Sequence, residues 1–381
     1  DLEQIGGPAY LAELTNRVAS SANVEYHSRI IIQKYIQREL IRVSAEVIKD
    51  SYEDTTDVFD LLDKTEKNIF AITDQNLRRG HEEMSHLLTK ALKEISDIRS
   101  NDGGFTGVPS GFSALDRITH GWQKSDLVIV AARPAMGKTA FVISMARNAA
   151  VDHNIPVAVF SLEMNALQLA KRLISSEAEI DGSKIRTGEM ADHEWQQLNA
   201  RIDRLAEAPI YIDDTPALNV FELRAKCRRL KASHNIQMII IDYLQLMQGS
   251  AEGNKNGNRE QEISHISRSL KVIAKELNVP VIALSQLSRA VETRGGDKRP
   301  VLSDLRESGS LEQDADMVCF LYRPEYYGFH QDNDGMSLEN VGEVIIAKHR
   351  NGPTDTVKLK FIKNQARFAD FDELGANDMI Q

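Results

Sequence analysis

The sequence from Leu127 to Thr139 reads Leu-Val-Ile-Val-Ala-Ala-Arg-Pro-Ala-Met-Gly-Lys-Thr, and a helical segment follows it over Ala140–Ala150. Its first six residues are a short apolar run of the kind that forms a buried strand. The Gly-Lys-Thr at its end therefore stands between a strand and a helix, which is the context that a phosphate-binding loop requires. Backbone N–H groups and the helix N-terminus of such a loop bind phosphate. The stretch predicts an α/β domain with a nucleotide site.

The residues of this loop have separate expected roles. Lys138 would reach the β- and γ-phosphates of a nucleotide, and the Thr139 hydroxyl would hold Mg²⁺. Ala132 stands where the common pattern has its first glycine, and because alanine is also small we expect little effect. The predicted nucleotide-binding residues of the loop are Arg133, Pro134, Ala135, Met136, Gly137, Lys138, Thr139 and Ala140.

Further apolar runs occur after residue 104 and alternate at first with segments of helical periodicity. The runs are Leu127–Ala132, Val157–Leu162, Met238–Asp242, Val281–Ser285, Met317–Tyr322 and Glu343–Ala347, and the helical segments include Ala140–Ala150, Leu167–Ala178 and Glu262–Leu277. Apolar strands separated by helices predict a mostly parallel sheet that is covered on both faces. Two late strands, Glu343–Lys348 and Thr356–Ile362, are joined through Asn-Gly-Pro, which predicts a hairpin. The polar segment Gly249–Asn258 predicts a mobile loop.

Three polar residues, Glu163, Asp242 and Gln286, stand at the carboxyl ends of these runs. Because the carboxyl ends of parallel strands meet at one edge of a sheet, we expect all three beside the phosphate loop. Asp242 would be the second Mg²⁺ ligand, reached through water, and Glu163 would orient or deprotonate the water that attacks the γ-phosphate. Gln286 would contact the γ-phosphate. Taken singly, each also has an ordinary interpretation as a turn, helix-start or loop residue.

The first hundred residues have a different pattern, with apolar residues at helical spacing. The predicted helices are Ser28–Asp50, Asp57–Asp74 and His81–Ile98, with a break at Asn76–Gly80 and a flexible linker at Ser100–Gly104. We therefore predict three parts: a helical domain over 1–80, a linker helix with its flexible linker over 81–104, and an α/β domain over 105–381.

Composition narrows the function classes. A chain of 381 residues fits two or three domains, and its formal charge of -10 excludes a general basic coat for nucleic acid. Any such binding must use a local patch, and with 6% aromatic residues a surface built on base stacking is not expected. The sequence contains no apolar stretch long enough to span a membrane and no secretory segment. Two distant cysteines favour a reducing cytoplasm.

The motifs occur in a familiar order. They are Ala-Arg-Pro-Ala-Met-Gly-Lys-Thr at 132–139, Phe-Ser-Leu-Glu-Met at 160–164, Ile-Ile-Asp-Tyr-Leu-Gln at 240–245, Ala-Leu-Ser-Gln-Leu-Ser-Arg at 283–289, Asp-Leu-Arg-Glu-Ser-Gly-Ser-Leu-Glu-Gln-Asp-Ala-Asp at 304–316 and Ala-Lys-His-Arg-Asn-Gly at 347–352. This set resembles the bacterial replicative DNA helicases of the DnaB type, whose motor domain has the RecA-like fold. The resemblance covers roughly Thr106 to Phe371. Residues 1–99 resemble the end of that family's helical N-terminal domain and its linker helix, and because the chain begins at Asp1 we expect an N-terminal truncation.

The resemblance implies a role for each matching residue. Lys138 and Thr139 would bind nucleotide phosphate and Mg²⁺, Asp242 would support the metal, Glu163 would be the catalytic glutamate and Gln286 the γ-phosphate sensor. These roles agree with the ones expected from the strand ends.

Three further roles come from the resemblance alone. Arg172 would pack on the adenine base. Lys348 and Arg350 would reach into the nucleotide site of a neighbouring subunit, with Arg350 as an arginine finger that stabilises transition-state charge. From their spacing alone, Lys348 and Arg350 would be solvated charges beside a hairpin.

The best candidate for nucleic-acid contact is the segment Gln286–Leu311, which has five basic and four acidic residues and no aromatic one. It favours a grip on phosphates by arginine and backbone N–H groups, without base stacking. The resemblance implies contacts along a central channel from Arg306, Glu307 and Gly309, and the predicted DNA-binding residues are Arg289, Arg294, Arg306, Glu307 and Gly309. Without the resemblance, a mobile polar loop is the better interpretation. The loop Gly249–Asn258 would also face the channel.

The leading hypothesis is an ATP-driven replicative DNA helicase. As the resemblance implies, it would assemble as a hexameric ring on single-stranded DNA, move 5′ to 3′, and work with primase and a helicase loader in the primosome. A RecA-like ATPase that coats DNA as a filament shares the same nucleotide residues. A ring-forming scaffold that binds nucleotide without turnover is the third hypothesis, and a small-molecule kinase is the weakest because no lid-like arginine-rich segment is evident.

Overall fold

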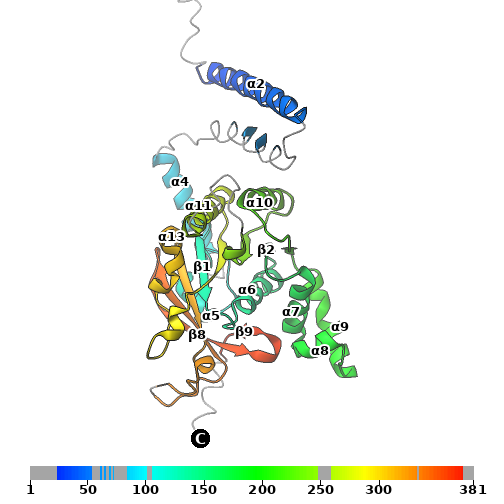
Figure 1. Ribbon diagram of the computed structural model, residues 1–381, viewed down its shortest axis with the longest axis vertical. Helices are drawn as coiled ribbons and strands as arrows, with labels where there is room; N and C mark the ends of the chain where they lie inside the picture. Colours follow the sequence, from blue (N-terminus) through cyan, green and yellow to red (C-terminus); the bar gives the residue numbers. More distant parts are fainter. Residues whose placement is uncertain are drawn as a thin grey trace, which may run out of the picture. The chain divides into compact units, whose positions relative to one another are not determined.

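The computed structural model describes residues 24–53, 61, 64, 65, 68, 69, 72, 84–100, 105–247, 259–332 and 334–371 (Figure 1). The chain divides into two compact units, Asp1–Ile95 and Ser96–Gln381, and each is considered by itself. The predicted domain boundaries at residues 80 and 104 and the predicted loop Gly249–Asn258 lie outside the described residues. Within the part of the chain that the structure describes, no helix is long and apolar enough to cross a membrane.

The first unit is helical where it is described. Helix α2 spans Val24–Ser51, which confirms the helix predicted from the spacing of its apolar residues. Lys64 forms ion pairs with Glu46 and Asp50 of α2, at 3.2 and 2.7 Å. Helix α4 spans Met84–Ser100, so it crosses the boundary between the two units, and it agrees with the predicted linker helix. Most of the predicted helix at 57–74 lies outside the described residues.

The second unit contains a sheet of nine strands in the order β3-β2-β4-β5-β1-β6-β7-β8-β9. The strands are β1 Leu127–Ala132, β2 Val157–Ser161, β3 Ile210–Asp213, β4 Met238–Asp242, β5 Val281–Gln286, β6 Met317–Tyr322, β7 Val341–His349, β8 Thr356–Ile362 and β9 Arg367–Ala369. Strands β3 to β6 in this order run parallel, and β7, β8 and β9 extend the sheet in antiparallel pairs. The predicted mostly parallel sheet and its late hairpin are confirmed. Strands β3 and β9, with only four and three residues, were not predicted.

Helices cover both faces of this sheet (Figure 1). The helices of this unit are α5 Ser113–Thr119, α6 Lys138–Arg147, α7 Ala166–Ala178, α8 Gly182–Thr187, α9 Asp192–Ala206, α10 Val220–His234, α11 Arg259–Leu277, α12 Ala290–Thr293 and α13 Gly309–Asp314, with shorter 3-10 or π-helical segments η3 Asn148–Asp152, η4 Leu244–Leu246, η5 Leu302–Ser308, η6 Pro324–Tyr327 and η7 Lys363–Gln365. Side chains of β1 alternate between two apolar cores, one shared with α6 and α7 and the other with α10 and α11. This alternation follows from the period of two residues in a strand. It fixes β1, and with it the start of the phosphate loop, between two packed layers.

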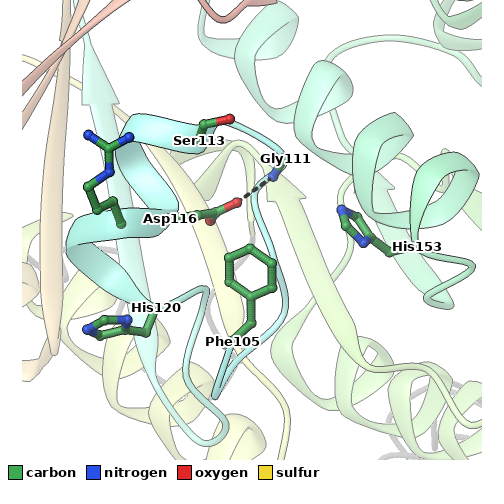
Figure 2. Close-up of a pocket in the computed structure, with 7 residues that line it drawn as sticks. Phe105, Gly111, Ser113, Asp116, His120 and His153 are labelled. Atoms are coloured by element: carbon green, nitrogen blue, oxygen red, sulfur yellow. Dashed lines mark hydrogen bonds between the residues drawn. The ribbon is translucent and has the colours of Figure 1, made fainter. Parts of the chain in front are cut away.

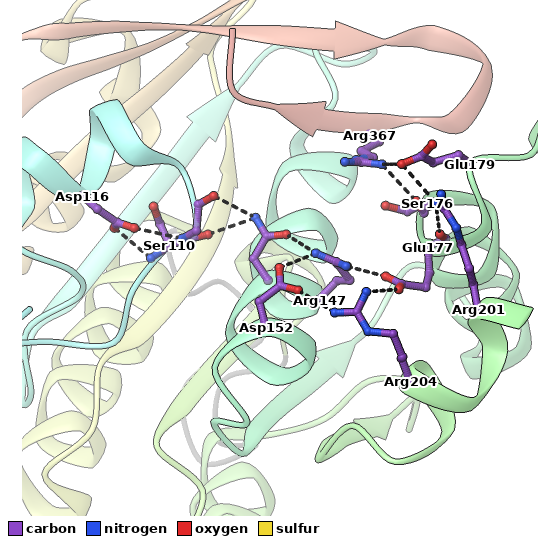
Figure 3. Close-up of polar contacts among 12 residues, drawn as sticks. Ser110, Asp116, Arg147, Asp152, Ser176, Glu177, Glu179, Arg201, Arg204 and Arg367 are labelled. Atoms are coloured by element: carbon purple, nitrogen blue, oxygen red, sulfur yellow. Dashed lines mark hydrogen bonds and ion pairs between the residues drawn. The ribbon is translucent and has the colours of Figure 1, made fainter. Parts of the chain in front are cut away.

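A polar network ties together the helices around α6 (Figure 3). Arg147 forms an ion pair with the buried Glu177 of α7 at 2.6 Å and another with Asp152 of η3. Arg204 of α9 bonds the same two carboxylates, at 3.2 and 3.1 Å. Because Glu177 is buried and doubly paired, removal of either arginine leaves it less well compensated.

The π-helical segment η3 continues α6 directly. At its first position, the Asn148 side chain donates hydrogen bonds to the carbonyl oxygens of Ser110 and Gly111, at 3.3 and 3.4 Å. Gly111 has a φ of +74°, and a Cβ atom at this position would lie 2.3 Å from the Cβ of Asn148. This contact joins the end of the α6 region to the chain that precedes α5.

Replacement of Phe368 by Ala should destabilise the second unit by about 3–5 kcal/mol, since a buried aromatic ring is lost and leaves a cavity. Phe368 is 2% exposed and contacts the rings of Phe141 and Phe361. Urea unfolding followed by circular dichroism measures the effect. The control is Phe221→Ala, at a phenylalanine that is 39% exposed, which should change the free energy of unfolding by less than about 0.5 kcal/mol. Equal losses in the two variants would contradict the assignment of Phe368 to the core.

Candidate functional site

Parallel pairing brings the predicted residues to one edge of the sheet. Ala132, the last residue of β1, pairs with Gln286 of β5, and Ser161 of β2 pairs with Asp242 of β4. Glu163 stands two residues beyond Ser161, so its carboxylate belongs to the same edge. The four strand ends expected from the sequence therefore come together.

The phosphate loop has the backbone conformation that its sequence suggests. Gly137 has a φ of +91° at the start of α6, and Ala135 is also left-handed, with a φ of +64°. A Cβ atom on Gly137 would lie only 3.1 Å from the Phe368 ring and 3.3 Å from the Phe361 ring. The loop therefore needs glycine at this position for both its conformation and its close packing on the C-terminal strands.

Two groups of opposite charge occupy the centre of this edge. Burial lowers the pKa of the Lys138 ammonium, while the charges of Asp242 and Glu163 act in the other direction. Burial raises the pKa of the Asp242 carboxyl, and the hydrogen bond from Thr139 opposes this shift. Lys138 Nζ donates to the Ala132 carbonyl at 3.1 Å, and Thr139 Oγ1 donates to Asp242 Oδ2 at 2.7 Å.

Thr139 and Asp242 fit a hard cation. Their contacting atoms are a hydroxyl and a carboxylate oxygen, which are the donors that Mg²⁺ prefers, and they already lie within hydrogen-bond distance of each other. The described residues contain no separate cluster of three His, Cys, Asp or Glu residues that could hold a metal.

Glu163 and Arg172 lie at the margin of the site. Glu163 is exposed, and Leu162 beside it donates its N–H to the Asp242 carbonyl at 2.7 Å. Arg172, on α7, is half-buried, and its charge lowers the pKa of Asp242. Both residues are therefore close enough to act on the charge at the centre of the site.

Arg133, predicted as a nucleotide-binding residue, has its side chain directed elsewhere. Its guanidinium forms an ion pair with Glu292 at 2.8 Å and donates to the Leu287 carbonyl at 2.8 Å. Only the backbone of Arg133 is left for a contact with phosphate. The side chain instead links the phosphate loop to the segment that follows β5, which carries the predicted DNA-binding residues.

Sequence reasoning missed Arg323, which is buried against the phosphate loop. It follows β6, the strand beside β1, and its guanidinium donates to the Ala135 carbonyl at 3.3 Å. The guanidinium also lies 4.0 Å from the centroid of the Phe361 ring. The available signal was the same one that pointed to Asp242: a charged residue at the carboxyl end of an apolar run.

Lys348 and Arg350 lie at the opposite edge of the sheet. Arg350 donates its N–H to the Asp316 carbonyl at 2.9 Å, and Asp316 donates its own N–H to the Leu127 carbonyl at 2.9 Å. Arg350 is therefore level with the start of β1, whereas the phosphate loop leaves its end, about 16 Å away along the strand. Lys348 Nζ donates to the carbonyls of Glu312 and Ala315, at 2.5 and 2.8 Å.

Arg350 belongs to a cluster of charged residues at this edge. Asp316 forms ion pairs with both Arg350 and Lys271, and Lys271 Nζ lies 3.8 Å from the Asp126 carboxylate. Burial and the nearby charge of Asp316 raise the pKa of the Asp126 carboxyl to about 6, although Lys271 and Arg350 oppose the shift.

The predicted DNA-binding residues are placed differently from one another. Arg289 is exposed and makes no ion pair with the described residues. Arg294 pairs with the buried Asp304 and donates to the Arg299 carbonyl at 3.1 Å, so it holds its own loop in place. Gly309 begins α13, and a Cβ atom there would meet nothing within 4 Å.

Arg306 and Glu307 lie within η5, immediately before α13. Their side chains lie outside the described part of the structure, so only their place in the backbone is established.

A separate pocket of about 460 Å³ lies beside α5 (Figure 2). Phe105, Gly111, Ser113, Asp116, Arg117, His120 and His153 line it, and none of them was predicted as a site residue. Asp116 accepts hydrogen bonds from the N–H groups of Ser110 and Gly111, at 2.8 and 3.0 Å. Its carboxylate therefore stabilises the turn before α5.

A parallel sheet that presents a phosphate loop, a buried carboxylate and an exposed glutamate at one edge defines a phosphate-loop nucleoside triphosphatase domain. Comparison with known proteins identifies its kind. The profile of the DnaB-like helicase C-terminal domain matches residues 107–370. The replicative DNA helicase DnaB of Geobacillus stearothermophilus is 49% identical over 373 residues, which are 97% of this chain and 80% of the relative.

Two solved structures agree with this result. The structure of a DnaB-like replicative helicase and its interactions with primase has a TM-score of 0.77 at 38% identity and covers 97% of this chain and 85% of its own. A second structure, that of an ATPase domain, has a TM-score of 0.70 at 43% identity and covers 77% of this chain and 100% of its own. The chain belongs to the family of DnaB-like replicative DNA helicases. The predicted RecA-like fold and the predicted ATP-dependent replicative helicase are confirmed.

The raised pKa of the Asp126 carboxyl should make the free energy of unfolding depend on pH. Its carboxyl has a pKa of about 6 in the folded chain and about 3.9 when unfolded. The folded state therefore binds this proton more tightly, and the associated stability is present below pH 4 and is lost as the pH rises through 6. Asp126→Asn, which cannot ionise, should become progressively more stable relative to the unmodified chain between pH 4 and 7. Urea unfolding at several pH values measures this, and a difference that does not change with pH would contradict it.

Proposed function

We propose that the chain unwinds duplex DNA as a ring hexamer that moves 5′ to 3′ on single-stranded DNA and hydrolyses ATP at its subunit interfaces. One observation carries this proposal: the residues that resemble the two halves of a shared site lie at opposite edges of the same sheet. Lys138, Thr139 and Asp242 belong to one edge, and Lys348 and Arg350 belong to the other. A chain with this arrangement needs a neighbour to complete its site.

The nucleotide half is suited to ATP and Mg²⁺. The phosphate loop and Lys138 would hold the β- and γ-phosphates, while Thr139 and Asp242 would hold the cation. Bound Mg²⁺ would neutralise charge that develops on the phosphate oxygens. The loop is packed against the rings of Phe361 and Phe368, and Arg323 donates a hydrogen bond to its Ala135 carbonyl. These contacts would hold the loop in one conformation when phosphate binds and when it leaves.

Hydrolysis then requires an activated water and a sensor. Glu163 is exposed at the end of β2 and can orient the attacking water or accept its proton. Gln286 is exposed beside the first residue of the loop, where its amide can contact the γ-phosphate. The Arg133–Glu292 ion pair connects the same loop to the segment after β5, and so offers a route from nucleotide to DNA.

The neighbouring subunit would supply Arg350. Because a guanidinium near the γ-phosphate stabilises the transition state, hydrolysis would depend on assembly, by a factor of about 10³–10⁵ in rate. The exposed apolar side chains Leu87, Leu88, Leu92 and Ile95 of α4 support docking of this helix on another subunit.

DNA would be held through its phosphates. Arg289 is exposed, and Gly309 lies at the start of α13, where a Cβ atom would meet nothing within 4 Å. Arg306 and Glu307 would contribute from the same segment. Phosphate contacts carry no sequence information, which suits an enzyme that moves along any strand. We infer primase and a helicase loader as partners, and a cytoplasmic location, from the family.

Unwinding of a forked duplex tests direction and energy source together. With ATP and Mg²⁺, strand separation should require a 5′ tail and fail with a 3′ tail. Lys138→Ala should abolish strand separation, because the β- and γ-phosphates of ATP lose the ammonium group that binds them. Turnover that is stimulated by DNA without unwinding would favour the filament-forming ATPase instead. No turnover in an assembled chain would favour the scaffold.

The variant Glu163→Gln tests the proposed catalytic role of Glu163 separately from nucleotide binding. The turnover number should fall by about 10²–10⁴, the contribution of a general base, while the affinity for ATP stays close to that of the unmodified chain. Steady-state hydrolysis and binding of a fluorescent nucleotide measure the two quantities. Glu189→Gln, at an exposed acidic residue between α8 and α9, is the control and should keep full turnover. Unchanged turnover in Glu163→Gln would contradict the catalytic role.

A further inference from the structure

We propose that Asp316 is the positioning residue that aims Arg350 at the nucleotide bound by the neighbouring subunit. This inference rests on the proposed function, in which Arg350 acts across the subunit interface. It concerns the residue immediately before β6, at the edge of the sheet that does not carry the phosphate loop.

Asp316 is fixed by the strand that carries the phosphate loop. Its backbone N–H donates to the Leu127 carbonyl at 2.9 Å, and its Oδ2 accepts the Leu127 N–H at 2.8 Å. The Asp316 side chain is only 8% exposed. With both its backbone and its side chain bonded to the first residue of β1, the carboxylate has one well-defined position.

From this position the carboxylate holds Arg350. Asp316 Oδ1 accepts from Arg350 Nη1 at 3.1 Å, and the Asp316 carbonyl accepts the Arg350 N–H at 2.9 Å. Arg350 Nη2 donates to the Gln313 carbonyl at 2.5 Å. The guanidinium is therefore anchored at two of its nitrogens, yet the side chain remains 45% exposed and can be reached by another molecule.

Asp316 has a second cationic partner besides Arg350, so Arg350 can also interact with a phosphate of the neighbouring subunit. Lys271 also pairs with Asp316, and Lys271 Nζ donates to the Ser125 carbonyl at 2.7 Å. When a phosphate meets the exposed part of the Arg350 guanidinium and weakens its bond to Asp316, Lys271 still compensates the buried carboxylate. If Asp316 is removed, Lys271 and Arg350 lose their shared counter-ion, and the guanidinium loses its fixed direction.

A structural role alone would be to join the start of β6 to the start of β1. The two roles differ in what they do to the kinetics. Asp316→Asn keeps an acceptor for the Leu127 N–H and removes the charge that binds Arg350. A misplaced arginine should lower the turnover number by about 10–100-fold, since a displacement near 1 Å can cost that much. The KM for ATP should stay unchanged, because the chain's own phosphate loop lies at the other edge.

The matched control is Asp126→Asn. Asp126 is a carboxylate of the same cluster that lies 3.8 Å from Lys271, and it makes no hydrogen bond to Arg350. Its turnover number at pH 8 should stay within about two-fold of the unmodified chain. An equal fall in both variants would mean that the charge of the cluster matters and the contact with Arg350 does not, which would overturn the proposal.

Mixed rings separate an effect across the interface from an effect within one subunit. Two differently tagged chains are co-expressed and purified through both tags. Lys138→Ala subunits have a defective phosphate site but an intact Arg350, so they should restore ATP turnover when mixed with Asp316→Asn subunits. Rings of either variant alone should be inactive or slow.

The same mixture with Arg350→Ala in place of Asp316→Asn tests the proposed function itself. If it gives no recovery, Arg350 does not act across the interface, and the proposed function fails. If it recovers while the Asp316→Asn mixture does not, Asp316 acts only within its own subunit, and the present inference fails. Recovery in both mixtures supports both.

A double-variant cycle gives a second readout that does not depend on mixing. In the Arg350→Ala background, Asp316→Asn should cause no further loss of turnover, because the group that it positions is already absent. A further ten-fold loss would overturn the proposal. If Asp316→Asn fails to assemble, Asp316→Glu keeps the charge that compensates Lys271 and moves the carboxylate, and the same three measurements apply to it.

Discussion

Parallel hydrogen bonding of β1 to β5 and β6 determines which groups can meet. Parallel strands send all their carboxyl ends to one edge of the sheet and all their amino ends to the other. The phosphate loop, Asp242 and Gln286 therefore share one edge, while Arg350 is bonded at the other through Asp316. No rotation of a side chain can bring these two sets together, so the sheet itself keeps them apart within one chain.

Burial gives the nucleotide edge its electrostatic character. The pKa of Lys138 is lowered and that of Asp242 is raised, both chiefly because the charged forms lose water. Each group therefore gains when an opposite charge comes close, a phosphate for the ammonium and a cation for the carboxylate. Glu163 is in a different environment, because its side chain is exposed to water.

The sequence predicted what depends on short patterns. Strands β1, β4 and β6 are continuous apolar runs, and Asp242 stands at the end of one of them, so both the sheet and the position of Asp242 at its edge could be predicted. Strand β9 was not predicted because a strand of three residues is too short to show an alternating pattern of apolar and polar residues. Arg323 stands at the end of an apolar run, as Asp242 does, but its contact with the phosphate loop could not be predicted because its partner, Ala135, is distant in the chain. The direction of the Arg133 side chain could not be predicted either, since its ion-pair partner, Glu292, lies on a different segment of the chain. Side-chain partners brought together by the fold have no local signature.

The contact between Gly111 and Asn148 has a consequence for variation in this family. A side chain at position 111 would collide with Asn148, and Asn148 belongs to the helical segment that continues from the phosphate loop through α6. A smaller residue at 148 would make room but would give up its hydrogen bonds to the carbonyls of Ser110 and Gly111. Glycine at position 111 is therefore required for two reasons, the close approach of Asn148 and its φ of +74°, and a smaller residue at 148 would remove only the first of them.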